Sequence, residues 1–283
     1  MSAVSRQNGI TIISGRQGVG KSYNINNIIK QYVGKGGKVL IYDVNDEYTD
    51  YQPIAWKEIG NQKRGTVRRV LPFRQVKGKV EAFGIEELKN GFLKLLEEYK
   101  DGLLILEDFN TYALNTRSQK VLSTITRARH KRIDIMIVLQ EISKVTKDLW
   151  GNISFYIYHK QQSDIDREKD KVANFMMVKI ADNIVNEQFT KSQLAFDASK
   201  ISEKQDTIHK SFFVYLNFKT NKISGCSKEA FDRALRRYLK ITNKEKEVKE
   251  YCIEKGWRFT NEEHKEKAYK DLIAVHSSYY GGM

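Results

Sequence analysis

Residues 15–22 match the phosphate-binding pattern GxxxxGK[ST] at each fixed position. The glycines let the backbone curl with its N–H groups facing inward, so that a polyphosphate meets several donors and the positive end of a helix dipole. Lys21 adds a positive charge for the β- and γ-phosphates, and the Ser22 hydroxyl is placed to coordinate Mg²⁺. The alternative is a glycine-rich turn before an ordinary helix. We predict that ATP and Mg²⁺ bind here, at Gly15, Gln17, Gly18, Val19, Gly20, Lys21 and Ser22.

An acidic pair, Glu107 and Asp108, follows the apolar run at 103–106. Such a strand end delivers one carboxylate to the metal and a second one to orient and deprotonate the attacking water. Order along the chain assigns Glu107 to Mg²⁺ and Asp108 to water, but the order is inverted relative to the commoner Asp-Glu ending, so the roles stay exchangeable. The alternative is a strand that ends in a solvated acidic turn. A phosphate-binding loop about 85 residues upstream favours a shared nucleotide site.

Gln140 ends a second apolar strand, expected at 133–139. A polar amide at the end of a buried parallel strand points into the crevice where α/β sheets hold ligands. We expect Gln140 to sense the γ-phosphate. The alternative is a glutamine that merely opens the next loop.

The elements that must position these residues follow from periodicity. A β-branched strand at 10–14 precedes the glycine loop, and Ile25, Ile28 and Ile29 then recur at helical spacing. Further along we expect a sheet-covering helix at 85–99, a core strand at 155–159, a hairpin from 212–216 and 222–224, and a helix capped by Ser227. This pattern predicts an α/β motor domain over 1–225 and a charged helical tail over 226–283, with frayed residues at 279–283.

The 283-residue chain carries a formal net charge of +14, which favours a polyanionic partner, and nucleic acid fits best. One acid-free window lies between Glu58 and Glu81, and we expect loops there, around one short strand at 66–71, that follow a phosphate backbone. A solvated basic face is the alternative. The basic residues of this window are Lys63, Arg64, Arg68, Arg69, Arg74, Lys77 and Lys79. A second window, between Asp108 and Asp134, holds Arg117, Lys120, Arg127, Arg129, Lys131 and Arg132.

Two cysteines, Cys226 and Cys252, have no spacing that indicates a disulfide framework or a zinc site. No apolar run approaches the length that crosses a bilayer, and the first residues lack the apolar core of a secretion signal. The sequence therefore predicts no membrane insertion and a cytoplasmic location.

Together these motifs resemble the FtsK/HerA superfamily of ring-forming, DNA-pumping ATPases. The resemblance rests on the glycine loop, the strand at 39–43 with the acids that follow it, the Glu107-Asp108 strand end, and Arg129-His130 before the strand that ends in Gln140. It covers roughly residues 8–160 and, weakly, the hairpin near 211–225. The compact chain is most similar to the genome-packaging ATPases of tailless icosahedral viruses. This implies a RecA-like P-loop core with a mostly parallel central sheet and a small C-terminal helical appendage.

The resemblance also implies roles for individual residues. Asp43 falls where the family has an acidic residue close to the nucleotide crevice. Arg129 occupies the position that reaches the neighbouring subunit's γ-phosphate, with Arg127 as second choice because it is only two residues away. His130 is interpreted as a packing or hydrogen-bonding residue and not as a general base, since Asp108 already supplies a base.

The implied function is an ATP-driven DNA translocase that packages a viral genome into a preformed capsid. Its partners would be DNA, contacted through the backbone, other copies of the chain in a ring (a hexamer before a pentamer), and capsid vertex proteins. Besides the cytoplasm, the packaging vertex of the virion is then an expected location. Two alternatives stay open: a related phage-assembly or conjugation-type DNA pump, and a P-loop small-molecule kinase.

Overall fold

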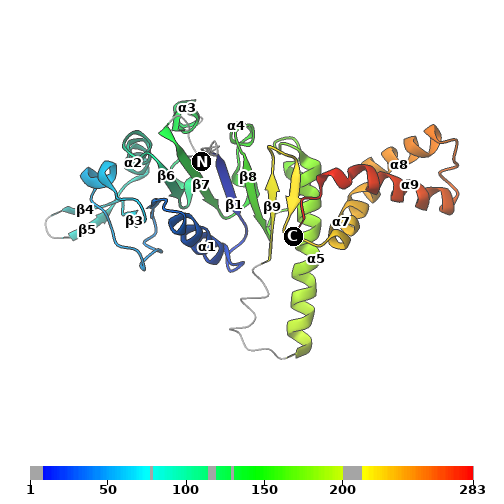
Figure 1. Ribbon diagram of the computed structural model, residues 1–283, viewed down its shortest axis with the longest axis horizontal. Coiled ribbons are helices and arrows are strands. Elements are labelled where there is room, and N and C mark those ends of the chain that lie inside the picture. The colour runs from blue at the N-terminus through cyan, green and yellow to red at the C-terminus, as the bar shows by residue number, and fades with distance from the viewer. Residues whose placement is uncertain (1–8, 77–78, 114–118, 129–130, 200–211, 283) are drawn as a thin grey trace.

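The computed structural model describes residues 9–76, 79–113, 119–128, 131–199 and 212–282 (Figure 1). The strands are β1 (Ile10–Ser14), β2 (Val39–Tyr42), β3 (Val67–Val70), β4 (Phe73–Val76), β5 (Lys79–Ala82), β6 (Gly102–Leu106), β7 (Ile133–Leu139), β8 (Phe155–His159), β9 (Phe213–Asn217) and β10 (Lys222–Ser224). The α-helices are α1 (Lys21–Gly34), α2 (Ile85–Glu98), α3 (Gln119–Ala128), α4 (Lys147–Trp150), α5 (Phe175–Ser199), α7 (Lys228–Lys240), α8 (Thr242–Glu254) and α9 (Glu262–His276). Short 3₁₀ helices are η1 (Trp56–Asn61), η2 (Phe109–Thr111), η4 (Ile142–Lys144), η5 (Ile165–Glu168) and η6 (Ser277–Tyr279).

The main sheet has eight strands in the described chain, in the order β10-β9-β8-β1-β7-β6-β2-β3. The strands from β8 to β3 run parallel, and β9 and β10 add an antiparallel hairpin at one edge. Central parallel strands are covered on both faces and therefore need apolar residues at every position, as in β6, which is buried throughout. The predicted α/β class with a mostly parallel sheet is confirmed.

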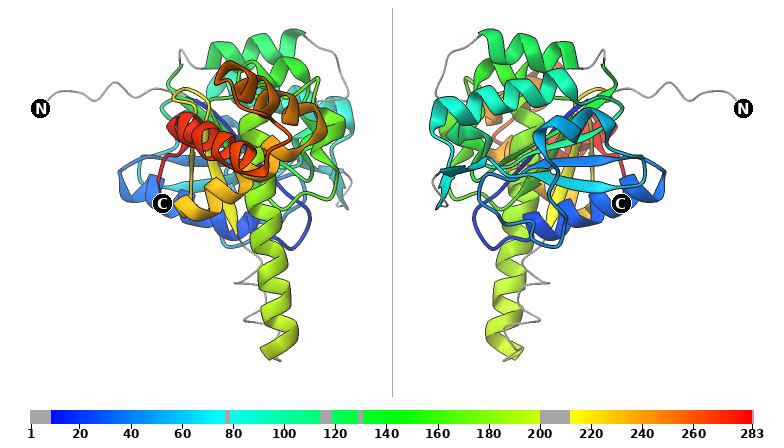
Figure 2. Two further views of the ribbon diagram at one scale, coloured as in Figure 1. Left: turned by 90° about the vertical axis from the view of Figure 1, so that its right-hand side faces the viewer. Right: turned by 90° about the vertical axis from the view of Figure 1, so that its left-hand side faces the viewer.

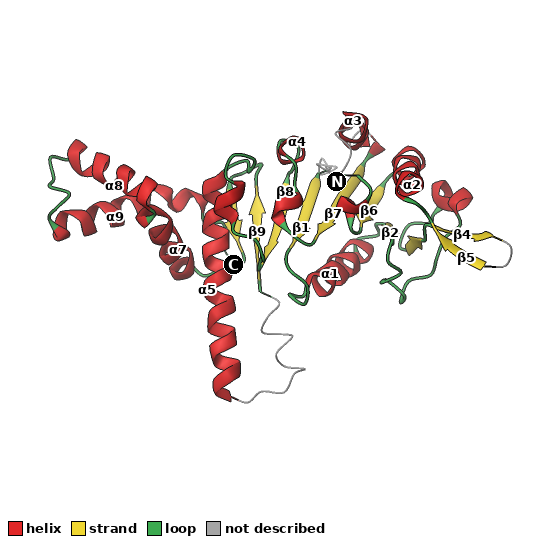
Figure 3. Ribbon diagram, turned by 180° about the vertical axis from the view of Figure 1, so that it is seen from behind, coloured by secondary structure: helices red, strands yellow, loops and turns green. Residues whose placement is uncertain are grey.

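Helices cover both faces of this sheet, as Figure 1 and the view from behind in Figure 3 show. One face packs against α1 through Ile13, Ile41 and Ile105. The other face packs against α2, α3 and α5, which share a core with Leu40 and Leu104. Because β1, β2, β6 and β7 run in the same direction, their carboxyl ends meet at one edge of the sheet.

The molecule is elongated, with the β4–β5 hairpin at one end and α8 and α9 at the other (Figure 1). Helix α5 extends well below the body of the protein in both side views of Figure 2. The hairpin corrects the sequence prediction for the first basic window: β3 lies where a strand was expected, but β4 and β5 replace the expected loops. All four residues of β5 are exposed, so its short alternation Lys-Val-Glu-Ala does not mark a buried face.

The C-terminal end is ordered, so the predicted fraying at 279–283 is wrong for the described residues 279–282. Tyr280 pairs with Ile223 of the edge strand β10, and the Gly281 N–H donates to the Ile223 carbonyl at 2.7 Å. A side chain at Gly281 would place its Cβ 2.5 Å from the Ser224 Oγ and 3.0 Å from the Ile223 carbonyl oxygen, so this close approach favours glycine. The segment satisfies backbone groups that an edge strand otherwise leaves unpaired.

The tail helices begin as predicted: the Ser227 hydroxyl accepts from the Ala230 N–H and caps α7. Helix α7 packs on α5, where the nearly buried Glu187 carboxylate binds Arg233 and Arg237. Within the described residues, no helix is both long and apolar enough to cross a membrane.

Candidate nucleotide-binding site

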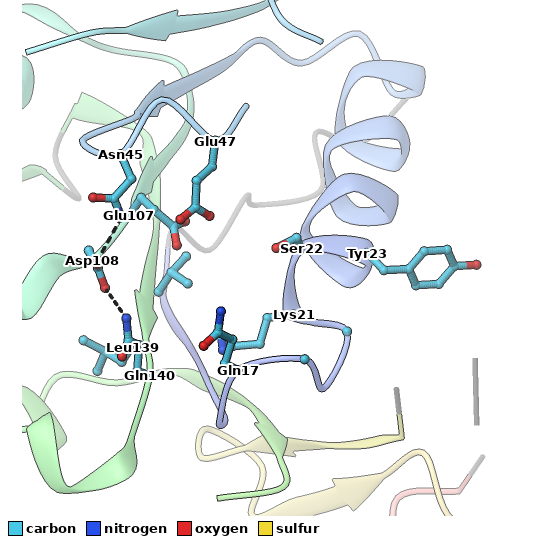
Figure 4. A pocket seen from close by; sticks show the side chains of 13 residues that line it. Gln17, Lys21, Ser22, Tyr23, Asn45, Glu47, Glu107, Asp108, Leu139 and Gln140 are labelled. Carbon is cyan, nitrogen blue, oxygen red and sulfur yellow. Dashed lines mark hydrogen bonds between the residues drawn. The ribbon is translucent and has the colours of Figure 1, made fainter. Parts of the chain in front are cut away.

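A cavity of about 570 Å³ opens at the carboxyl edge of the sheet, a size typical of small-ligand sites. Figure 4 shows Lys21 and Ser22 on one side and Asn45, Glu107 and Asp108 on the other. The lining residues are Gln17, Gly18, Gly20, Lys21, Ser22, Tyr23, Asn45, Glu47, Glu107, Asp108, Val138, Leu139 and Gln140. The fold thus brings together the glycine loop, the acidic pair and the strand-end glutamine that the sequence singled out.

The glycine loop has the conformation that its sequence predicts. Gly18 and Gly20 have φ angles of 78° and 80°, in the left-handed region that favours glycine. Gly15 lies against β8, where a side chain would place its Cβ 2.5 Å from the His159 Cβ. Val19 is buried beneath the loop, so Gly15 and Val19 shape the loop from below, whereas Gln17, Gly18 and Gly20 line the cavity.

Lys21 begins α1 at the floor of the cavity. Its ammonium Nζ donates to the carbonyls of Gly15 at 2.6 Å and Arg16 at 3.0 Å. Burial lowers the pKa of Lys21, and the nearby carboxylates of Glu107 and Asp108 oppose this shift. An ammonium has three donors, so one N–H is left for a phosphate.

Glu107 is nearly buried at the end of β6, and its Oε2 accepts from the Tyr48 hydroxyl at 2.7 Å. Burial raises the pKa of Glu107 to about 7, although the Tyr48 hydrogen bond and Lys21 oppose the shift. A cation beside this carboxylate would favour its charged form.

A magnesium ion fits the chemistry of these donors. Mg²⁺ takes one or two protein oxygens and completes its shell with phosphate and water, and the Ser22 hydroxyl and the Glu107 carboxylate are hard oxygen donors in one cavity. Among the described residues, no cluster of three or more His, Cys, Asp or Glu side chains could hold a metal by itself.

Asp108 follows in the left-handed region, with a φ of 45°. Its Oδ2 accepts from the Asn45 amide at 3.0 Å, and its Oδ1 accepts from the Gln140 amide at 3.4 Å. Figure 4 draws both contacts. Gln140 therefore faces the acidic pair from β7, as expected of a strand-end amide at this edge.

Asn45 and Tyr48, which come from the turn after β2, were not predicted as site residues. Glu47, one of the acids after the strand at 39–43 on which the resemblance rests, lines the cavity. The available signal was the polar run at 43–51, which directly follows a buried parallel strand and had to lie at the same edge as the glycine loop.

Asp43 does not line the cavity. It is fully buried, and its carboxylate accepts from the backbone N–H groups of Glu47 and Tyr48 and from Arg69 at 3.0 Å. The carboxylate thus shapes the turn that carries Asn45 and Glu47. Asp43, which was expected close to the nucleotide, thus affects the cavity through this turn and does not line it.

Arg69 corrects the interpretation of the first basic window. It is only 9% exposed, and it binds Asp43, Asp46 and the Tyr51 carbonyl instead of solvent or a phosphate backbone. Arg74 pairs with Glu81 and Glu87. Both arginines are neutralised by acids outside the window or at its end, which a count of charges within the window does not reveal.

The second basic window reaches the opposite edge of the sheet. Arg127 is exposed near the end of α3, just before β7 begins, and its Nε donates to the Ser123 carbonyl. Arg117, Arg129 and His130 lie outside the described residues, as does the side chain of Lys120.

Several exposed basic residues lie at this opposite edge, where β2, β3 and β6 begin, and we call them the basic edge: Lys35, Lys63, Arg64 and Lys100. Lys35 and Arg64 line one cavity of about 410 Å³ together with Asp101. Arg64 and Lys100 are close enough to Lys38 to lower its pKa, after burial as the larger cause. Arg68 is half-buried and donates to Gln52, so we leave it out of this surface.

Comparisons with known proteins agree with this geometry. The family model for the central domain of the helicase HerA matches residues 2–250. The genome packaging NTPase B204 of Sulfolobus turreted icosahedral virus 2, solved with AMPPCP, is similar with a TM-score of 0.50 and 14% identity, over 77% of this chain and 96% of that chain. B204 of Sulfolobus turreted icosahedral virus, a DNA-packaging ATPase, matches over the same shares with a TM-score of 0.47 and 17% identity. No curated protein matches in sequence. At these identities the structural likeness shows the fold.

Proposed function

The chain belongs to the family of the HerA helicase central domain, a family of P-loop ATPases, and on that premise we propose that it hydrolyses ATP to move DNA. One observation carries the proposal: a single cavity presents the loop residues Lys21 and Ser22 opposite the carboxylates of Glu107 and Asp108. Phosphoryl transfer needs positioned phosphates, compensated charge and an oriented water, and these residue types supply all three.

The chain's own groups divide this work. The loop N–H groups and the N-terminus of α1 bind the phosphates, and the Lys21 ammonium compensates their charge. Asp108 accepts a proton from the attacking water, and Gln140 beside it contacts the γ-phosphate. The Ser22 hydroxyl and Glu107 would hold Mg²⁺, which would offset the negative charge that develops on the phosphate oxygens.

A neighbouring subunit supplies the remaining positive charge. Arg127 lies near the end of α3, and β7, which follows, spans seven residues, or roughly 23 Å, before it reaches the nucleotide edge. An arginine near the end of α3 is therefore too far from the nucleotide site of its own subunit, but it can act at the nucleotide site of a neighbouring subunit. We assign this role to Arg129 first and Arg127 second, which requires a closed ring, a hexamer before a pentamer.

The DNA would be a duplex held by its phosphates at the basic edge. The likeness to B204, which covers 96% of that chain, supports genome packaging as the task. Under this proposal the ring works in the cytoplasm of a host or at a capsid vertex, where vertex proteins would be its further partners.

ATP turnover with and without duplex DNA tests the proposal. DNA should raise turnover, and small phosphate acceptors should not. Lys21→Ala should abolish turnover because the phosphates lose their point charge, and Asp108→Asn should still bind ATP while turnover falls by about 10²- to 10⁴-fold. Turnover near the parental rate in either variant, or acceptor-dependent turnover typical of a kinase, would reject the assignment.

Mixed assemblies test the shared site. Arg129→Ala should bind ATP without cleaving it, and mixing it with Asp108→Asn protein should restore activity at interfaces that combine an intact Arg129 with an intact Asp108. If Arg127→Ala shows this loss and recovery and Arg129→Ala does not, Arg127 is the arginine that acts at the neighbouring site. No recovery with either arginine variant would contradict a site shared between subunits.

A further inference from the structure

Asp108 is held by two amides that come from different elements. The Asn45 amide reaches Oδ2 from the turn after β2, and the Gln140 amide reaches Oδ1 from the end of β7. Asn45 makes the shorter contact, at 3.0 Å against 3.4 Å. A carboxylate has about four lone-pair positions, so both oxygens can be fixed in this way and still accept a proton from water.

The turn that carries Asn45 is itself built around an ion cluster. Asp46, next to Asn45, has a φ of 58°, in the left-handed region where a residue other than glycine needs support from its surroundings. Arg69 of β3 supplies that support, because one guanidinium binds Asp46, the buried Asp43 and the Tyr51 carbonyl. Asp43 in turn accepts from the N–H groups of Glu47 and Tyr48.

We propose that Asn45 is a positioning residue that fixes the plane of the Asp108 carboxylate, and that Arg69 acts on Asp108 through Asn45 by holding this turn. The inference rests on the proposed function, in which Asp108 activates water. It adds a chain of contacts that links Arg69 on β3, the outer edge strand of the main sheet, to the carboxylate of Asp108.

Orientation is what these contacts contribute. Asp108 lies just past the end of β6, where the sheet no longer fixes its backbone, so its side chain depends on its partners for direction. A general base has to lie within hydrogen-bond reach of its water, and a displacement of about 1 Å can lower a rate by about 10²-fold. Among the described residues, losing Asn45 leaves Asp108 with the longer Gln140 contact.

Asn45→Ala should therefore lower kcat by about 10- to 100-fold. The Kd of a non-hydrolysable ATP analogue should stay within about twofold, because Asn45 lies across the cavity from Lys21 and Ser22, on the side of Asp108. Asn90→Ala, the same change at an exposed position of α2, is the matched control and should leave kcat at the parental value.

A double-mutant cycle tests this chain of contacts. Arg69→Gln should also lower kcat, and the double variant with Asn45→Ala should be no slower than Asn45→Ala alone, since both changes act at one contact. Arg68→Gln, at the neighbouring position whose side chain points to the other face of β3, is the control and should leave turnover without DNA unchanged. If Arg69→Gln does not fold, Asp46→Ala removes one carboxylate partner of Arg69 at a half-exposed position and should behave in the same way.

The outcomes separate this inference from the proposed function. Parental kcat in Asn45→Ala, or effects of Asn45→Ala and Arg69→Gln that multiply in the double variant, would overturn the inference while Asp108→Asn stayed inactive. Parental turnover in Asp108→Asn would overturn the proposed function itself.

Discussion

His159 lies beneath the phosphate-binding loop, at the end of β8. Its ring is fully buried, and its Nε2 lies 3.1 Å from the Asn24 amide of α1. Burial lowers the pKa of His159 from 6.5 to about 3, and the charge of Lys21 adds to this shift. The loop therefore rests on a neutral imidazole, and protonation of that ring opposes the folded state.

This shift predicts a pH dependence of stability. Between about pH 6.5 and 3 the unfolded chain binds the proton more readily, so the free energy of unfolding should fall as pH falls through this window, by up to about 1.4 kcal/mol per pH unit. His159→Phe should reduce that slope, whatever it does to stability at pH 8. Urea unfolding at several pH values measures it, and parent and variant slopes that agree would contradict a buried neutral His159.

The sequence identified site residues that belong to a local motif. It did not identify those whose role comes from a contact with a residue distant along the chain. Lys21, Glu107 and Gln140 were predictable, because each stands at the end of a recognisable strand or loop. Asn45 was not, since its importance comes from Asp108, which is 63 residues away. Arg69 was misinterpreted for the same reason: its partners Asp43 and Asp46 lie outside the acid-free window.

Elements buried on both faces were the easiest to predict. The strands expected at 10–14, 133–139 and 155–159 agree with β1, β7 and β8, because their apolar runs end sharply at polar or glycine residues. The exposed β5 and the C-terminal pairing with β10 were missed, since neither buries a repeating set of side chains.

The parallel strands also separate the charges of the molecule. Carboxylates gather where β2 and β6 end, and the basic edge lies where β2, β3 and β6 begin.

The basic edge predicts where DNA binds. Replacing Lys35, Lys63, Arg64 and Lys100 by Gln should weaken DNA binding for all sequences alike. It should also flatten the dependence of log K on log salt, by about 0.9 for each phosphate of the duplex that the variant no longer binds. ATP turnover without DNA should persist, because these residues lie away from the nucleotide cavity.

A charge-matched control replaces four exposed lysines of the tail helices by Gln: Lys246, Lys249, Lys267 and Lys270. This variant should keep the parental affinity and salt slope. If the tail variant loses affinity while the basic-edge variant keeps it, DNA binds the C-terminal helices and not the sheet edge.

The whole molecule has the candidate nucleotide site at one edge of the sheet and the basic edge at the other, with the tail helices α7 to α9 fixed to the body at both ends. Helix α7 packs on α5, and the last described residues pair with β10, so the tail is tied to the sheet and is not a free appendage. The sequence predicted the helices of the tail but not the pairing of its last residues with β10.

Displacement of a third strand from a DNA triplex tests the central claim most directly, because only a protein that moves along the duplex removes the strand. The parent protein should release the third strand when ATP is added, in proportion to the ATP it hydrolyses. Lys21→Ala, which lacks the ammonium that meets the phosphates, should release none. Parent protein that hydrolyses ATP in the presence of the triplex and still leaves the third strand bound would contradict a motor that moves on duplex DNA.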